Sequence, residues 1–207
     1  MNAILFYIFT ALLSPVYANW THGDTLAPLD LLNNDNFGEH LSIDGDLLAV
    51  AAPKDDGVGG TWDLGIVYTF NWDGSQWVSV GTLQPTDLVN WDKFGSSLSL
   101  SGTKLIVGVP TKDEVASNAG KVYAFTWDGT TWNQIQSRTS DVLLPLSFFG
   151  SDVSVSNDKL AISASNHDGK GAVFTYTWNG SQWIQDSNIL IPVSLVSGDS
   201  FGFSVSM

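Results

Sequence analysis

One short pattern occurs four times in this chain, as Asp35-Asn36-Phe37-Gly38, Asp92-Lys93-Phe94-Gly95, Ser147-Phe148-Phe149-Gly150 and Asp199-Ser200-Phe201-Gly202. Its phenylalanines lie 57, 55 and 52 residues apart. Each Phe-Gly is followed by apolar residues that alternate with serine, a pattern that predicts a β-strand with one face towards a core. Repetition at this period predicts an array of similar structural units.

Three further strands are predicted within each repeat. In the first copy, Asp44-Gly45 favours a hairpin turn before the small apolar residues of a second strand. The third strand ends at Trp72, and Asp73-Gly74 predicts a two-residue turn into a fourth strand that carries Trp77. This turn would place Phe70 opposite Trp77. The other two complete copies repeat these elements.

The tryptophans beside the Asp-Gly or Asn-Gly turn recur in every complete copy. An aromatic column on a sheet that packs against another sheet predicts core between the repeats. A row of sugar-stacking sites is the alternative interpretation.

The reading frame gives the domain organisation. We expect a signal peptide at residues 1–18, an orphan fourth strand and linker at 19–36, and complete blades at 37–93, 94–148 and 149–200. Residues 201–207 are expected to form the first strand of a truncated blade. The predicted fold is therefore an all-β β-propeller fragment of four-stranded antiparallel blades. Either the sequence is truncated at Met207, the interpretation we favour, or several chains close one ring as an oligomer.

The repeat resembles the FG-GAP repeat of the integrin α-subunit N-terminal propeller. Its second element reads Ala51-Ala52-Pro53 and Gly108-Val109-Pro110 in the first two copies, whereas the third copy departs from it. The chain is similar to secreted FG-GAP proteins whose repeats carry a Trp-Asp-Gly turn. The resemblance implies an extracellular binding or adhesion function. Many family members bind calcium between their first two strands, but here this segment is a short hairpin with few carboxylates, so no metal site is predicted.

Composition narrows the classes of partner. The formal charge of −13 disfavours nucleic acid and anionic membrane surfaces. Residues 1–18 have the apolar run and small residues of a secretory signal, which predicts a secreted protein without membrane insertion of the mature chain. A buried hydrophobic segment is the alternative. The chain contains no cysteine, which excludes disulfides and thiolate chemistry.

No catalytic motif is found in the sequence. It lacks nucleophile-elbow, zinc-protease, phosphate-loop and EF-hand patterns, so we expect no enzyme activity, no catalytic residues and no cofactor. His22, His40 and His167 share no ligand spacing and are interpreted as surface or turn residues.

Candidate ligand-binding residues lie in the longer loops, which are expected to emerge at one end of the blades. Trp62 and Trp91 lie outside the repeat pattern, and local loop packing is the alternative to ligand contact. Asp55, Asp56 and Asp63 are candidate ligand contacts and are also explained as surface acids. Asn179 begins an Asn-Gly-Ser glycosylation motif.

The resemblance to integrin propellers therefore implies a non-catalytic extracellular binding or adhesion module, and we expect a protein or glycan ligand at the long-loop face. Two alternatives are a carbohydrate-binding, lectin-like propeller and a non-catalytic part of a larger secreted enzyme.

Overall fold

The computed structural model describes residues 25–57, 62–139, 142 and 144–207. In these residues the chain forms three four-stranded antiparallel sheets and a short 3₁₀ helix, η1 (His167–Gly169), and each sheet follows chain order. The first sheet contains β1 (Leu41–Asp44), β2 (Leu47–Ala52), β3 (Ile66–Trp72) and β4 (Trp77–Leu83). The second contains β5 (Ser97–Ser101), β6 (Lys104–Val109), β7 (Lys121–Trp127) and β8 (Trp132–Arg138). The third contains β9 (Phe149–Ser156), β10 (Lys159–Ala164), β11 (Ala172–Trp178) and β12 (Trp183–Leu190).

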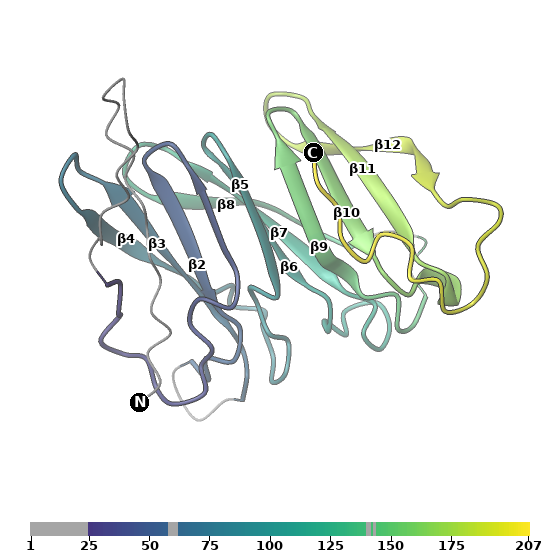
Figure 1. The fold of residues 1–207 in the computed structure, drawn as a ribbon, viewed down its shortest axis with the longest axis horizontal. Helices are drawn as coiled ribbons and strands as arrows, with labels where there is room; N and C mark the ends of the chain where they lie inside the picture. Colours follow the sequence, from purple (N-terminus) through teal and green to yellow (C-terminus); the bar gives the residue numbers. More distant parts are fainter. Residues whose placement is uncertain (1–24, 58–61, 140–141, 143) are drawn as a thin grey trace, which may run out of the picture.

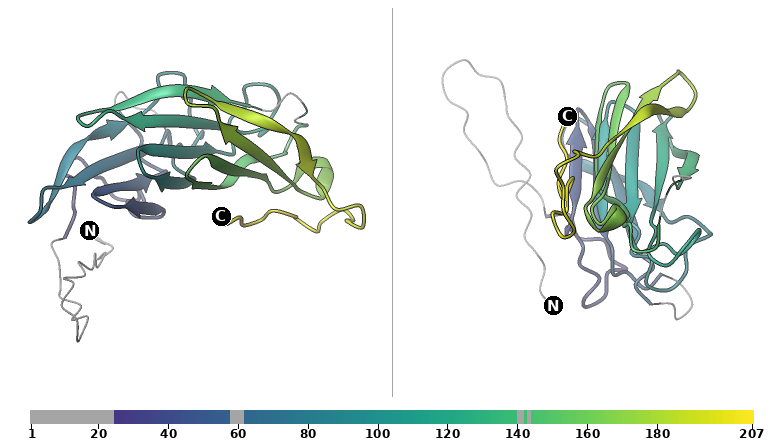
Figure 2. Two further views of the ribbon diagram at one scale, coloured as in Figure 1. Left: turned by 90° about the horizontal axis from the view of Figure 1, so that it is seen from above. Right: turned by 90° about the vertical axis from the view of Figure 1, so that its right-hand side faces the viewer.

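The sheets pack face to face in a curved row, which Figures 1 and 2 show from three sides. One apolar cluster joins the first two sheets and includes Ala49 and Phe125. A second cluster joins the second and third sheets and includes Ile106 and Phe174. Successive four-stranded sheets in this arrangement are blades of a β-propeller. The chain is thus an all-β propeller fragment, and its sheets are called blades 1, 2 and 3 below.

The contacts between neighbouring blades, called seams below, explain why each repeat contains a Phe-Gly motif. Phe149 of blade 3 is fully buried, and its main-chain N–H donates to Ala119 O of blade 2 over 2.9 Å. Gly120 adopts a φ of +90°, and a Cβ there would lie 2.2 Å from Phe149 O. Only glycine allows this close approach of two backbones. The same contact joins Gly65 to Phe94 and Gly171 to Phe201.

Four of the recurring tryptophans belong to the core between blades, as predicted: Trp127, Trp132, Trp178 and Trp183. Trp77 instead packs against a cluster of blade 1 alone. Trp183 is 2% exposed and packs among residues of blades 2 and 3, while Trp132 packs against the cluster between blades 1 and 2. The predicted two-residue turn was wrong. Trp72 lies directly opposite Trp77, with four residues between them. The turn is longer because the Asp73 carboxylate accepts hydrogen bonds from the main-chain N–H groups of two residues that follow it.

Residues 201–207, predicted to form a first strand, contain no strand and instead run beside β9. Val205 N donates to Asp152 Oδ2 over 2.7 Å, and Met207 N donates to Ser154 Oγ over 3.0 Å. Such bonds to side chains do not form a β-ladder. Residues 25–36 contain no strand, while the predicted signal peptide and residues 19–24 lie outside the described residues. No helix in the described part of the chain is long and apolar enough to cross a membrane.

Candidate functional site

The longer connections between strands lie together at one end of the blades (Figure 1). They comprise the segments that follow β2, β4, β6, β8 and β10, and the opposite end carries the short hairpin turns. We call the first end the long-loop face. Loops held at one end of a rigid sheet framework are where binding residues concentrate.

Two tryptophans from different loops meet on this face. Trp62 follows β2 and Trp91 follows β4, and their rings stack with centroids 6.0 Å apart and planes 16° apart. They are 57% and 54% exposed, unlike the core tryptophans of the repeat. The pair therefore presents a flat aromatic surface to solvent, the kind of surface that stacks on sugar rings or anchors protein side chains.

Main-chain hydrogen bonds across the seam between blades 1 and 2 hold the pair. Trp91 N donates to Trp62 O over 2.8 Å, and Phe94 N donates to Leu64 O over 2.8 Å. Asn90 Oδ1 accepts from Trp62 N over 3.2 Å, and Thr111 Oγ1 donates to Trp91 O over 3.0 Å. The backbones of both tryptophans are thus fixed before any ligand arrives.

The other seams make the same contact without tryptophan. Leu146 N donates to Ser117 O over 2.7 Å between blades 2 and 3. Gly198 N donates to Gly169 O over 2.7 Å at the far side of blade 3. The seam therefore does not require an aromatic residue at either position, and the indole pair is a feature of one seam alone among the described residues.

Trp91 also has an unfavourable backbone conformation. Its φ is +73°, in the left-handed region, which costs a residue with a Cβ about 1–2 kcal/mol. The residues three positions before the other Phe-Gly motifs also have positive φ: Asn34, Leu146 and Gly198. Asparagine and glycine adopt this conformation most readily, so tryptophan, like the exposed Leu146 of the next seam, carries backbone strain here.

The candidate acids divide into two groups. Asp63 and Asp56 lie in the Trp62 loop, where Asp63 pairs with Lys93 over 3.8 Å and Asp56 Oδ1 accepts from Asp63 N over 3.0 Å. Asp55 instead faces inward, is 7% exposed and accepts from Tyr68 Oη over 3.2 Å. Burial raises the pKa of Asp55, and nearby acidic charges add to this effect. Asp55 therefore lies below the surface that a ligand of the tryptophan pair would contact.

No group of three or more acidic, histidine or cysteine side chains among the described residues has the arrangement of a metal site.

A buried polar position beneath each seam differs from blade to blade. In blade 2, Lys112 Nζ pairs with Asp92 Oδ2 over 2.7 Å, and both side chains are buried. In blade 3, His167 lies 3.3 Å from Ser147 Oγ and is 8% exposed, so it is a turn residue, as one of the two interpretations had it, but not a surface residue. Burial lowers the pKa of His167. These residues hold the loops beneath the face and do not reach its surface.

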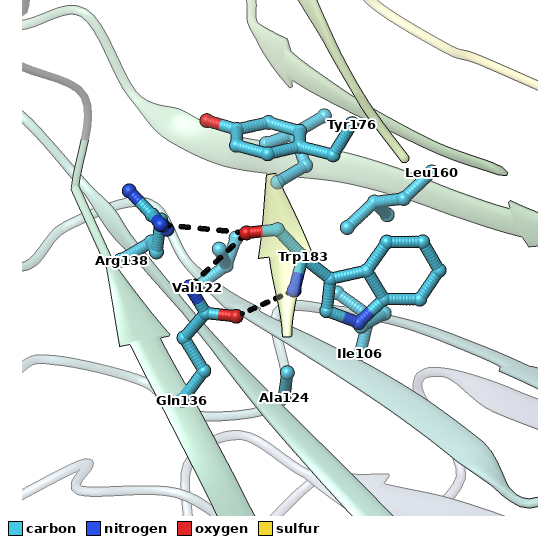
Figure 3. Close-up of a pocket in the computed structure, with 9 residues that line it drawn as sticks. Ile106, Val122, Ala124, Gln136, Arg138, Leu160, Tyr176 and Trp183 are labelled. Carbon is cyan, nitrogen blue, oxygen red and sulfur yellow. Dashed lines mark hydrogen bonds between the residues drawn. The ribbon is translucent and has the colours of Figure 1, made fainter. Parts of the chain in front are cut away.

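A small cavity lies between blades 2 and 3 near the outer strands (Figure 3). Gln136 Oε1 accepts a hydrogen bond from Trp183 N over 3.0 Å. Gln136 Nε2 and Arg138 Nη2 each donate to Trp183 O over 3.3 Å. The remaining lining is largely apolar: Ile106, Val122, Ala124, Leu160, Ile162 and Tyr176. These contacts join the outer strands β8 and β12, so we interpret the cavity as part of the packing between blades.

The repeat geometry agrees with a family comparison. The family model described as FG-GAP repeat matches residues 20–70 and 77–125, which include the Phe-Gly motifs of blades 1 and 2. The chain carries FG-GAP repeats. No curated protein matches this FG-GAP chain in sequence. Among solved structures, it is similar to a chain described as a europium-containing methanol dehydrogenase, with 14% identity and a TM-score of 0.41. The match covers 74% of the FG-GAP chain and 25% of the dehydrogenase chain.

Sequence reasoning singled out both tryptophans but missed the residues that hold them, Asn90 and Thr111. It also missed the left-handed conformation of Trp91. The residues three positions before the Phe-Gly motifs are Asn34, Trp91, Leu146 and Gly198, so alignment alone shows asparagine and glycine at two of the four positions and bulky residues at the other two.

Proposed function

We propose that this FG-GAP protein is a non-catalytic extracellular binding module that recognises a protein through the Trp62–Trp91 pair. The observation that carries the proposal is the pairing of two exposed indoles at a seam position where the other seams have Ser117 with Leu146 or Gly169 with Gly198. Aromatic residues of this kind supply a large share of binding energy at protein interfaces.

The backbone strain at Trp91 supports a role of this residue in binding. A left-handed tryptophan that is 54% exposed loses backbone stability and gains little from burial. Strained residues that persist at a surface are found preferentially at ligand sites. Trp62, fixed by its own main-chain bonds, completes a surface that needs little ordering when a ligand binds.

The extracellular setting rests on the predicted signal peptide and on the integrin resemblance. Asn179 fits this setting because it is an exposed residue of the β11–β12 turn. Its Oδ1 accepts hydrogen bonds from Ser181 N and Gln182 N, while no hydrogen bond of its Nδ2 is present among the described residues. The nitrogen that would carry a glycan is therefore accessible, and we propose Asn179 as a glycosylation site.

A glycan is the second candidate ligand, and the flat exposed indole faces favour it. Sugar rings stack on such faces through their C–H groups, and polar groups around the pair would fix their hydroxyls. Asn90 Oδ1 accepts a hydrogen bond from Trp62 N, and Asp63 follows Trp62 directly in the chain, so both polar residues lie beside the pair.

Binding arrays test the proposal. The purified chain is applied to an array of extracellular proteins and to a glycan array, beside Trp62→Ala and the matched control Val89→Ala. Val89 is 56% exposed in the same loop region as Trp91 but does not contribute to the stacked pair. We expect a signal that Trp62→Ala abolishes and Val89→Ala preserves. A signal that survives Trp62→Ala, or silence on both arrays, would count against binding by this pair.

A further inference from the structure

The first strand of blade 1 exposes apolar residues whose counterparts in the other two blades are buried, while the rest of that face, including Leu48, Val50 and Tyr68, is buried. In β9 of blade 3, Val153 and Val155 are 4% and 6% exposed because they pack against blade 2. Leu100 of blade 2 is 6% exposed against blade 1. The corresponding residues of β1, Leu41 and Ile43, are 44% and 47% exposed. The first strand of blade 1 therefore has the apolar side chains of a seam without the partner blade.

Main-chain donors of this strand also lack a partner blade among the described residues. Leu100 N donates to Ser42 Oγ of the preceding blade over 3.0 Å, and Val155 N donates to Ser99 Oγ over 3.0 Å. No such hydrogen bond from Ile43 N is present among the described residues. The same holds for Phe37 N, whereas Phe94 N donates to Leu64 O across its seam.

The complementary half of a seam is found on blade 3. Lys170 O accepts from Phe201 N over 2.7 Å, Ser154 Oγ accepts from Met207 N, and Gly171 leaves room for the Phe201 backbone. The segment that now occupies these groups is weakly packed, since Phe203 is 78% and Met207 50% exposed. Its motif, Asp199-Ser200-Phe201-Gly202, matches Asp35-Asn36-Phe37-Gly38 at three of four residues.

We propose that blade 1 docks on blade 3 of a second copy of this chain, with residues 35–44 replacing residues 199–207 there. Phe37 then enters the space beside Gly171 of the other copy, and Ile43 N donates to its Ser154 Oγ. The occupant is a second copy because blade 3 carries each acceptor that the unused donors require. The described residues of two copies bring six blades together, within the range of about four to eight that closed propellers use. The contact is head-to-tail and closes into a ring when two copies complete the circle.

Sedimentation of the purified chain at several concentrations tests this docking. We expect the mass of two chains at high concentration, and the mass of one chain for Ile43→Asp at the same concentration. Val115→Asp is the control, because Val115 is 55% exposed on a loop away from β1. One chain at every concentration, a dimer that survives Ile43→Asp, or an open series of larger assemblies would overturn the proposed ring.

A disulfide experiment defines the contact itself. The chain has no native cysteine, so Ile43→Cys in one preparation and Ser154→Cys in another report only the designed pair. We expect oxidation of the mixture to give a covalent heterodimer in preference to either homodimer. Ser154→Cys paired with Val78→Cys, an exposed position on β4, is the control. Equal crosslinking of both pairs would overturn the proposal. Neither result depends on the tryptophan pair or its ligand.

Discussion

Replacing Gly120 with alanine perturbs the seam between blades 2 and 3 at its closest backbone contact. The new Cβ would lie 2.2 Å from Phe149 O and 2.4 Å from Phe149 N, atoms that cannot move without moving the chain. The left-handed φ adds about 1–2 kcal/mol of strain. Displacement of Phe149 breaks its hydrogen bond to Ala119, worth about 1 kcal/mol, and withdraws a fully buried ring whose complete loss costs about 3–5 kcal/mol. We therefore expect a loss of at least about 3 kcal/mol in the free energy of unfolding.

Urea unfolding followed by tryptophan fluorescence measures this loss, and Gly129→Ala is the matched control. Gly129 has a φ of +101°, but a Cβ there meets no atom within 4 Å. It should lose only the backbone strain of about 1–2 kcal/mol. Equal losses for the two variants would refute the reasoning, because the close approach of the blades would then contribute nothing.

Three further predictions concern the core and its buried charges. Trp183→Ala should lose about 3–5 kcal/mol of unfolding free energy in urea, because the indole is 2% exposed between two blades; a loss below about 1 kcal/mol would contradict its core role. Burial raises the pKa of Asp55, so the folded state holds this proton more tightly than the unfolded state and stability falls as pH rises from 3.8 towards the raised value. Asp55→Asn should remove this decrease when the unfolding free energy is measured as a function of pH. An unchanged dependence of the unfolding free energy on pH would contradict the prediction. Lys112→Ala should lower the free energy of unfolding by about 3–5 kcal/mol, because it leaves the buried Asp92 carboxylate unpaired. Lys170→Ala, which removes an exposed ion pair, should lower it by less than about 1 kcal/mol. Equal losses in thermal unfolding would contradict this prediction.

Much of the architecture follows from local sequence, because each element is encoded within one repeat. Alternating serine and apolar residues predicted the first strands, and the structure shows why both are needed. Ser42 and Ser99 bind the next blade through their hydroxyls, while Val153 and Val155 pack against the preceding one. The turn at Asp73 was predicted two residues too short, because its length depends on side-chain to main-chain bonds that the Asp-Gly pair does not specify.

The residues of the candidate site could be predicted from the sequence, but their arrangement in space could not. Trp62 and Trp91 were identified because they lie outside the repeat pattern, but their stacking depends on main-chain bonds across a seam. No local pattern contains that pairing. Asp55 was grouped with Asp56 and Asp63 by adjacency, yet Tyr68, 13 residues away, directs its carboxylate inward.

If Trp91 serves ligand contact and not folding, replacing it with asparagine should separate binding from stability. Asparagine adopts the left-handed conformation at the equivalent position Asn34. Relief of about 1–2 kcal/mol of strain should offset the loss of the stacked pair, about 0.5–1.5 kcal/mol. The measurement is the unfolding free energy of Trp91→Asn beside its binding to the ligand that the arrays identify. We predict stability within about 1 kcal/mol of the wild-type chain and loss of binding. Destabilisation by about 3 kcal/mol would show that Trp91 serves the fold, and binding equal to that of the wild type would show that it does not contact the ligand.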